Sequence, residues 1–127
     1  MIRKAVRRLL EEEGVKGKKE ISIAIVDVHT MRDLQMRYKG VDYPTDVLAF
    51  PIGGRVFGDV IVCADVAEEQ GREYGTGFLK EVIILVLHGV LHLLGYEDST
   101  KEGAELMLSK ATDIADKVMG DGKEKAS

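Results

Sequence analysis

The sequence predicts a single α+β domain in which helices pack on a small mixed β-sheet of three or four strands around one buried helix. The 127-residue chain is long enough for one domain with a hydrophobic core of its own. Short runs with strand-like alternation are interleaved with longer runs of helical periodicity. The run from Val82 to Leu94 is apolar on every side except at His88, Gly89 and His92, which is typical of a buried helix.

The first third of the chain predicts two helices around one strand. A helix is expected from Ile2 to Glu13, ending near Gly14, and the β-branched alternation of Glu20 to Asp27 predicts a strand. Thr30, with Asp33 three residues later, resembles a capping box that opens a second helix, which ends at a glycine, residue 40. The inner face of that helix carries Met31, Leu34 and Tyr38.

A hairpin is predicted in the middle of the chain. Asp46 to Phe50 reads as a short strand, Gly53-Gly54 as the turn signal, and Val56 to Ala64 as the antiparallel second arm. Asp65 with Glu68 has the spacing of a cap for the next helix, which runs to about residue 74. A Gly-Thr-Gly segment then separates this helix from the buried one.

The last predicted helix has a core-packing stripe and no pattern typical of a cofactor site. Ser99 and Glu102 have capping-box spacing at its start. Its apolar side carries seven residues at helical spacing, namely Ala104, Met107, Leu108, Ala111, Ile114, Ala115 and Val118. We therefore expect one domain over residues 1–119 and a disordered polar tail over residues 120–127.

The buried helix carries a candidate metal site. His88 and His92 are four residues apart, so both imidazoles project from the same helical face, as the first two ligands of a divalent metal require. Gly95 ends the helix, and Glu97 and Asp98 follow on a chain that has turned back. Either carboxylate is a candidate third ligand.

Spacing alone leaves two interpretations of the histidine pair equally supported: a metal site, or two core histidines that are hydrogen-bonded within the protein. Gly89 occupies the position of the general base in His-Glu-x-x-His, which disfavours a zinc peptidase. His29, the remaining histidine, is distant in sequence and is expected in a loop.

The run from His88 to Asp98 resembles the signature of the YbeY family, metal-dependent endoribonucleases of bacterial ribosomal RNA maturation, which read His-Gly-x-Leu-His-Leu-x-Gly-Tyr-Asp-His. Three upstream segments, in the right order, resemble further motifs of that family: Tyr38-Lys39-Gly40, Pro44-Thr45-Asp46-Val47-Leu48-Ala49-Phe50-Pro51 and Gly58-Asp59-Val60. Together they cover roughly residues 30 to 100, which makes the resemblance far more specific than any single motif.

The resemblance implies a zincin-like α+β fold in which an edge strand and the metal helix line one cleft. It implies one divalent metal, with zinc expected and Mn or Ni as alternatives, held by His88, His92 and Asp98. Lys39 falls at the position of the family's active-site arginine and is implied as a catalytic and phosphate-binding residue, with Thr45 and Asp46 as further substrate-binding residues. Family members usually place a strand before the first helix, and this sequence has no room for one.

Three departures from the family pattern change the expected chemistry. The third metal histidine is Asp98 here, the preceding Asp is Glu97, and the arginine is Lys39. A carboxylate ligand lowers the net charge of the site and makes oxygen-preferring metals more competitive. Lysine keeps the positive charge but lacks the planar fork that binds a phosphate through two hydrogen bonds. No general base is evident, since Asp46 and Asp59 are equally well explained as structural residues.

Charge is distributed unevenly along the chain. The net charge is −4, yet residues 1–19 carry seven basic and three acidic side chains, a local charge of +4. Basic residues at i,i+4 spacing on the first helix could hold RNA phosphates, but the sequence favours an ordinary solvated helical face.

The single Cys63 lies in an apolar run, which predicts a buried reduced thiol. The 13-residue apolar run is too short to span a membrane, so we expect a cytoplasmic protein.

The resemblance therefore implies a metal-dependent, single-strand-specific endoribonuclease in ribosomal RNA maturation and ribosome quality control. Its implied partners are ribosomal RNA precursor and either the small ribosomal subunit or assembly factors; the oligomeric state is left open. Two other classes stay open at this point. One is a metallohydrolase of another substrate, and the other is a nonenzymatic RNA-binding ribosome-assembly factor with a structural metal.

Overall fold

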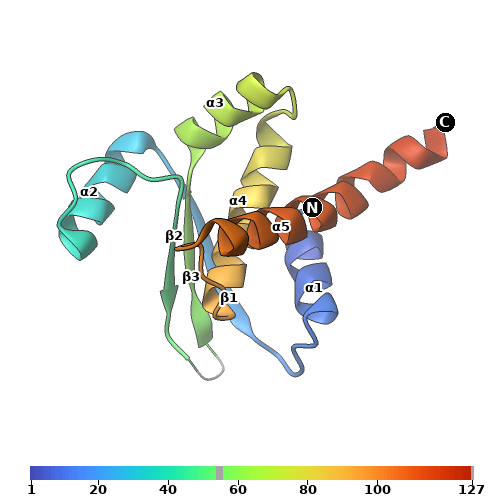
Figure 1. The fold of residues 1–127 in the computed structure, drawn as a ribbon, viewed down its shortest axis with the longest axis horizontal. Helices are drawn as coiled ribbons and strands as arrows, with labels where there is room; N and C mark the ends of the chain where they lie inside the picture. Colours follow the sequence, from blue (N-terminus) through green and yellow to red (C-terminus); the bar gives the residue numbers. More distant parts are fainter. Residues whose placement is uncertain (54–55, 127) are drawn as a thin grey trace.

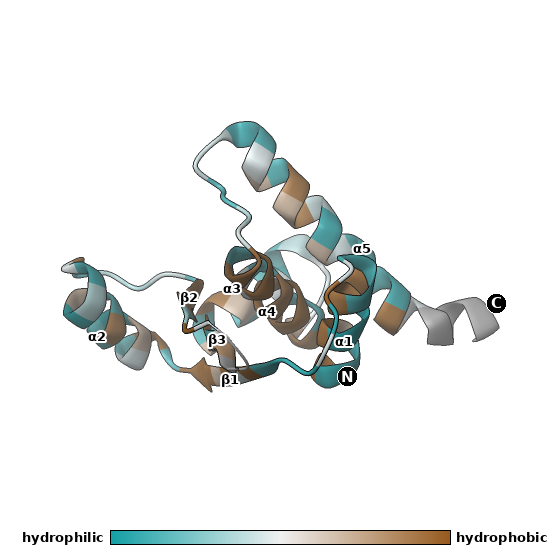
Figure 2. Ribbon diagram, turned by 90° about the horizontal axis from the view of Figure 1, so that it is seen from below, coloured by the Kyte–Doolittle hydropathy of each residue, from teal (hydrophilic) through white to brown (hydrophobic). Residues whose placement is uncertain are grey.

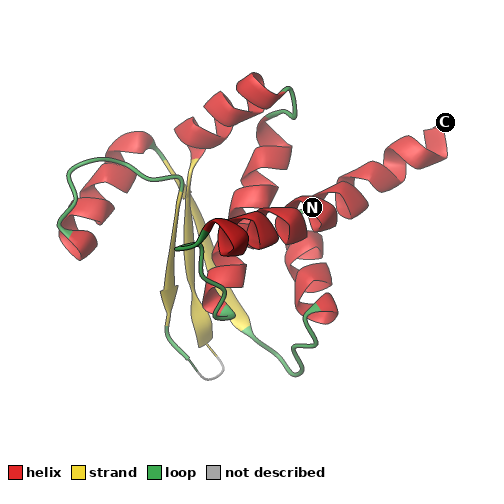
Figure 3. Cartoon of the chain, viewed as in Figure 1, coloured by secondary structure: helices red, strands yellow, loops and turns green. Residues whose placement is uncertain are grey.

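The protein is an α+β domain built on a three-stranded mixed sheet (Figures 1 and 3). The computed structural model describes residues 1–53 and 56–126. Its elements in chain order are α1 (Ile2–Glu12), β1 (Glu20–Val26), α2 (Val28–Lys39), β2 (Val47–Pro51), β3 (Val56–Cys63), α3 (Ala64–Tyr74), α4 (Phe78–Leu93) and α5 (Lys101–Ala126). The predicted fold class is confirmed, with three strands.

The sheet has the order β1-β3-β2, so β3 is central and the other two strands are edges. β2 pairs antiparallel with β3 from Val47 opposite Val62 to Pro51 opposite Gly58, which confirms the predicted hairpin pairing. The turn at Gly53-Gly54 lies partly outside the described residues. β1 pairs with β3 in parallel, and the chain between them runs through α2 and the edge strand β2.

Helix α4 packs on one face of the sheet and is the most deeply buried element (Figure 2). Its close approach to β3 depends on Gly89. A Cβ atom at this position would lie 2.5 Å from Val60 Cγ1 and 3.2 Å from Val47 Cγ2, so any larger residue would push the helix off the sheet. Helices α1, α3 and α5 surround the remaining sides of α4 (Figure 1).

A second, smaller core lies on the opposite face of the sheet. Alternation along the strands points Leu48 and Cys63 away from α4 and toward α2, where Met31 is fully buried between them. Cys63 is a free, buried thiol, as predicted. Tyr38 was predicted on the inner face of α2, but it is 61% exposed and packs its ring only on the edge-strand residue Phe50.

Both predicted caps of α2 and α3 were wrong. The N-cap of α2 is Asp27, whose carboxylate accepts a hydrogen bond from the Thr30 backbone N–H at 2.8 Å, so the helix begins three residues earlier than the Thr30 capping box would place it. Asp65 does not cap its own helix. Its carboxylate accepts from the backbone N–H of Val28 at 3.0 Å, and it thereby joins the start of α3 to the start of α2.

The start and the length of α5 also differ from prediction. Thr100 Oγ1, rather than the predicted Ser99, accepts the hydrogen bond from the Gly103 backbone N–H. Leu108 was predicted in the core stripe but is 56% exposed. α5 continues as a helix to Ala126, beyond the end of the stripe, and the disordered tail over residues 120–127 stays a prediction.

In the described part of the chain no single helix is both long enough and apolar enough to cross a membrane. The pair α3 and α4 meets both criteria only when the two helices are taken together, and they are bent by 119° relative to each other.

Candidate metal centre

The last turns of α4 and the loop that follows bring three ligand atoms together. His88 Nε2 and His92 Nε2 lie 3.1 Å apart, because the two residues are one helical turn apart on the same face. Asp98 Oδ2 lies 3.2 Å from the first nitrogen and 3.4 Å from the second. These three residues, here called the triad, form a group that can hold a metal ion.

The spacing of the triad fits a tetrahedral metal site. Bonds of about 2.0–2.1 Å to a tetrahedral metal set neighbouring ligand atoms about 3.3 Å apart, and the three measured separations of 3.1, 3.2 and 3.4 Å match this value. When both imidazole nitrogens are unprotonated, as metal binding requires, the three ligand atoms are all acceptors and cannot satisfy one another. A cation at their centre would satisfy all three.

A backbone carbonyl fixes the orientation of one imidazole. His92 Nδ1 lies 3.1 Å from the carbonyl oxygen of Tyr96, so this nitrogen carries the proton and donates it. In the neutral imidazole this leaves Nε2 of His92 as the unprotonated nitrogen, and it faces the other two ligand atoms. Metal-binding histidines are commonly held in this way by a carbonyl on the second nitrogen.

The charge state of Asp98 suits a ligand. Burial acts to raise the pKa of its carboxyl, but Coulombic attraction to His92 and the hydrogen bond with His88 outweigh burial and hold that pKa below its ordinary value of 3.8. The side chain is therefore ionised at neutral pH. Glu97, the other candidate ligand, instead lines a neighbouring pocket.

The loop that carries Asp98 is fixed at both ends. Gly95 adopts a φ of 101°, a conformation open to glycine, and Tyr96 N–H donates to Leu91 O at 3.0 Å to close the helix end. At the other end, a Cβ on Gly103 would collide with the carbonyl oxygen of Glu97, so the small residue lets α5 pack against the loop.

A hydrogen-bond network among Tyr96, Glu13 and Lys110 supports the same loop, and no sequence pattern predicted it. The Tyr96 hydroxyl donates to Glu13 at the end of α1, and Lys110 Nζ on α5 donates to the same carboxylate at 2.9 Å. The hydrogen bond from Tyr96 is the main cause that holds the pKa of Glu13 below its ordinary value. No local sequence signal reveals contacts between residues so far apart in the chain.

Two concave regions flank the triad. On the side of His92, a pocket of about 290 Å³ is lined by Lys39, by backbone and side chains of β2, and by Glu97. On the side of His88, a more apolar groove of about 640 Å³ runs between α3, α4 and α5 and includes Tyr74 and Leu108. The exposed leucine that departs from the predicted core stripe therefore belongs to the wall of this groove.

The other residues named from sequence take different places around the triad. Lys39 shares the pocket of His92, and Asp46 lines the groove of His88. Asp46 Oδ1 accepts from the Val47 backbone N–H at 2.8 Å and from Thr45 Oγ1 at 3.3 Å, so both side chains shape the turn into β2. His29 is not in a loop; it lies exposed in the first turn of α2, outside the triad.

Comparison with known proteins decides the family. A sequence model described as Endoribonuclease YbeY matches residues 1–119. The chain belongs to the YbeY family. Two relatives named Endoribonuclease YbeY are those of Carboxydothermus hydrogenoformans, 42% identical over 118 residues, and of Bacillus velezensis, 38% identical over 129 residues. The alignments cover 90% and 91% of this chain and 81% and 82% of the relatives.

The fold agrees with a solved structure. The solution structure of TM1509 from Thermotoga maritima superimposes with a TM-score of 0.70 at 28% sequence identity, over 98% of this chain and 83% of that one. The YbeY match includes every element from α1 to α4 and α5 as far as residue 119, and therefore the triad, Lys39 and the β2 segment. The resemblance seen in the sequence is thus confirmed at the level of the family.

Proposed function

We propose that this protein is a metal-dependent, single-strand-specific endoribonuclease that acts in ribosomal RNA maturation and ribosome quality control in the bacterial cytoplasm. The observation that carries this proposal is the convergence of His88, His92 and Asp98 at metal-ligand spacing in a chain of the YbeY family. Its relatives are named as endoribonucleases, and a cleft of helix and edge strand supports the zincin-like arrangement.

The triad is proposed to hold one divalent ion, zinc in the first place and Mn or Ni as alternatives. Two imidazoles and one carboxylate are a donor set that zinc accepts, and the carboxylate makes Mn more competitive than it would be with three histidines. When bound, the ion supplies Lewis-acid chemistry to a phosphodiester and its attacking oxygen. Three protein ligands leave a coordination position for the substrate.

Lys39 is proposed as the residue that neutralises charge on the scissile phosphate. Its side chain lines the same pocket as His92, and a positive charge next to the reacting phosphoryl group stabilises the oxygens on which negative charge builds up. Thr45 and Asp46 are proposed to contact the substrate at the start of β2. Because their side chains hold that turn in place, their contribution includes keeping the edge strand beside the triad.

The shape of the site supports a single-stranded substrate. The polar pocket on one side of the triad suits a phosphate, whereas the apolar groove on the other side, with Tyr74 in its wall, suits an unstacked base. A base within a duplex is stacked and cannot enter such a groove. Ribosomal RNA precursor, which exposes single strands between helices, is the proposed substrate, with the small ribosomal subunit or assembly factors as proposed partners.

The test is cleavage of a labelled RNA that contains one hairpin and one single-stranded segment. We expect cuts confined to the single strand, loss of cleavage in chelator, and recovery on adding zinc, Mn or Ni. Lys39→Ala should lose about 100-fold in kcat/KM, as expected for one electrostatic group at a reacting phosphate. Lys39→Arg should retain activity, and Lys16→Ala, on an exposed loop residue, should match the wild type.

Three outcomes would contradict the proposal. Cleavage that persists in chelator would remove the metal from the mechanism. RNA binding without cleavage in any of the metals would favour an assembly factor with a structural metal. Hydrolysis of a peptide or of a small phosphodiester, with RNA left intact, would favour a metallohydrolase of another substrate.

A further inference from the structure

The pairing of β2 with β3 fixes the direction of each backbone N–H group of β2. At one end of the pairing, Cys63 N–H donates to Asp46 O at 2.8 Å, and at the other end Ile52 N–H donates to Phe57 O at 3.0 Å. Both bonds involve even-numbered residues on the β2 side. Because hydrogen-bonded and non-hydrogen-bonded positions alternate along an antiparallel pair, the backbone groups of the odd-numbered residues point away from β3.

One of these outward positions offers a backbone donor. Within β2 (Val47–Pro51), all of which the structure describes, the odd-numbered residues are Val47, Ala49 and Pro51. Val47 N–H already donates to Asp46 Oδ1 at 2.8 Å, and a proline has no N–H, so Ala49 supplies the remaining outward donor. A carboxylate and a proline on an outer edge discourage the addition of a strand, so this N–H suits a small acceptor better than a peptide.

The pocket beside the triad lies in the direction in which the Ala49 N–H points. Ala49 lines this pocket of about 290 Å³ together with Lys39 from α2 and His92 from α4. These two helices pack on opposite faces of the sheet, on either side of β2 (Figure 1). Leu48 also lines the pocket, although it is only 3% exposed and its side chain packs in the core on the α2 face. The pocket therefore lies across the outer edge of β2.

A phosphate in this pocket needs a donor of fixed direction. The lining contains one basic side chain, Lys39, and one acidic side chain, Glu97, so the charges of these two cancel. The ammonium of a lysine is a point charge on a flexible stem. A backbone N–H held by the sheet is already oriented and costs no reorganisation at the moment of reaction.

We propose that the backbone N–H of Ala49 donates a hydrogen bond to one nonbridging oxygen of the scissile phosphodiester, beside Lys39. No proton is transferred. The bond strengthens as negative charge builds up on that oxygen, which is how an oxyanion hole raises a rate. This inference rests on the proposed nuclease function and adds a division of roles: the ammonium supplies charge, and the amide of the edge strand orients the phosphate.

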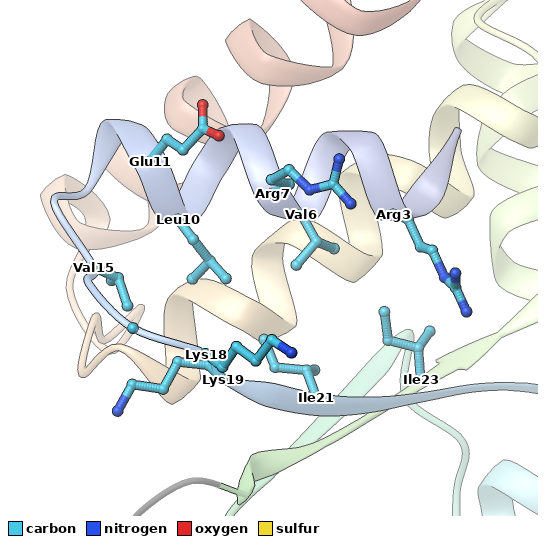
Figure 4. A pocket seen from close by; sticks show the side chains of 11 residues that line it. Arg3, Val6, Arg7, Leu10, Glu11, Val15, Lys18, Lys19, Ile21 and Ile23 are labelled. Atoms are coloured by element: carbon cyan, nitrogen blue, oxygen red, sulfur yellow. The ribbon is translucent and has the colours of Figure 1, made fainter.

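A second region of the surface attracts phosphate by charge alone and has to be separated from this site. The groove of about 530 Å³ between α1 and β1 contains no residue of the triad (Figure 4). Its basic lining residues are Arg3, Arg7, Lys18 and Lys19. Arg7→Ala weakens this groove and leaves the pocket beside the triad intact, so it is the control variant for phosphate binding.

The first test is NMR of the zinc-loaded protein labelled with ¹⁵N-alanine and titrated with dimethyl phosphate, a minimal phosphodiester. We expect the amide proton of Ala49 to shift downfield until the site is saturated. The amide of Ala24, an exposed residue of β1 outside the pocket, should not shift. Arg7→Ala should give the same response as the wild type. An Ala49 amide that does not shift, or a shift that is lost in Arg7→Ala, would overturn the proposal.

The second test removes the donor. Ala49→Pro deletes the N–H without breaking a bond to β3, because this N–H points outward, and edge strands accept proline at such positions. On a single-stranded RNA with one cleavable linkage, kcat should fall about 100-fold, as for the loss of one donor to a developing negative charge. Metal affinity should stay at the wild-type level. Lys101→Pro deletes an exposed N–H in the first turn of α5, where proline is accepted, and should match the wild type.

An ester in place of the Leu48–Ala49 amide, introduced by semisynthesis with lactate at position 49, is the second variant. It removes the same N–H and keeps the Ala49 methyl group, so it should lose activity in parallel with Ala49→Pro. Wild-type kcat in the ester protein would overturn the proposal, even if Ala49→Pro is inactive.

Phosphorothioate substrates separate a direct contact from a structural loss. Sulfur is a weak hydrogen-bond acceptor, so sulfur in place of the oxygen that faces Ala49 removes the contact from the wild type as well. Ala49→Pro should therefore cost about 100-fold on one diastereomer and at least about 10-fold less on the other. Equal losses on both diastereomers would overturn the proposal. A wild-type protein that cleaves no RNA would count against the nuclease function, whereas equal cleavage by wild type and Ala49→Pro would count against this inference alone.

Discussion

The polar side chains at the two ends of α4 differ in what they contact. Near its N-terminus, Glu81 is only 5% exposed, yet its carboxylate accepts a 2.6 Å hydrogen bond from Thr76 Oγ1 and lies in the first turn, where the helix dipole favours negative charge. Near its C-terminus, His88 and His92 point their Nε2 atoms toward each other and toward the Asp98 carboxylate.

This difference separates a structural polar group from a binding site. A buried polar group that finds its partner within the chain stabilises the fold. The triad atoms, by contrast, contact one another, and when both Nε2 atoms are unprotonated they are three acceptors that a bound cation satisfies together. The same helix therefore carries a stabilising end and a ligand-binding end, and the two should respond differently to substitution.

The largest effect is expected at the ligand-binding end. His92→Ala removes one of three ligand atoms, so metal affinity should fall by more than about 100-fold, beyond the 10- to 100-fold typical of residues that only orient a ligand. The free energy of unfolding of the metal-free protein should fall by no more than about 1.5 kcal/mol, because the hydrogen bond lost with the side chain, from His92 Nδ1 to the Tyr96 carbonyl oxygen, is a single one that is only partly buried.

Metal competition titration and urea unfolding in chelator measure these two quantities. His29→Ala, on an exposed residue of α2, is the matched control and should alter neither. A large loss of stability in metal-free His92→Ala would show that the histidine pair is structural.

The N-terminal end should show the reverse. Glu81→Ala leaves the Thr76 hydroxyl without its acceptor in a poorly solvated place, which should lower the free energy of unfolding by about 1–3 kcal/mol. Glu81→Gln keeps an acceptor and should lose less. Metal affinity should be unchanged in both, as measured by the same titration, and a parallel loss of metal binding would erase the distinction between the two ends.

A smaller effect is expected at the network that supports the metal loop. The pKa of Glu13 lies below its ordinary value of 4.5, chiefly because of the hydrogen bond from Tyr96, so its stabilisation is present above that value and is lost as the pH falls through the lower folded pKa. The pKa values of Tyr96 and Lys110 are raised, mainly by hydrogen bonds with Glu13, so their stabilisation is lost as the pH rises through their folded values.

Glu13→Gln should therefore flatten both limbs of the stability profile, below about pH 4.5 and above about pH 10, with a loss near neutrality of about 1–2 kcal/mol. Urea unfolding across the pH range measures the effect. Glu11→Gln, two residues earlier in the chain and exposed, is the control. Identical acid limbs in wild type and Glu13→Gln would show that the network does not stabilise the loop.

Local patterns explain what the sequence could predict. The i,i+4 histidines, the helix-ending Gly95 and the following acidic residue depend on contacts within a few residues of one another, and the structure brings them together as expected. The hairpin follows for the same reason. Gly89, between the histidines, permits a close approach, and the approaching group is Val60 of the sheet.

Long-range contacts explain what the sequence could not predict. Glu13 and Tyr96 are 83 residues apart, and Glu13 and Lys110 are 97 apart, so no periodicity links them. Asp65 has the spacing of a local cap, but its carboxylate instead accepts a hydrogen bond from the backbone N–H of Val28, 37 residues away. Leu108 fits the core stripe of α5 by spacing, yet the helix turns it into a groove beside the triad.

The most direct test of the triad is the metal affinity of Asp98→Ala beside that of Glu97→Ala, measured by metal analysis and competition titration of the purified proteins. Wild type and Glu97→Ala should each hold about one divalent ion per chain with equal affinity, whereas Asp98→Ala should bind at least about 100-fold more weakly. Wild-type affinity in Asp98→Ala, or loss of the ion in Glu97→Ala, would contradict the claim that two imidazoles and the Asp98 carboxylate form the metal centre.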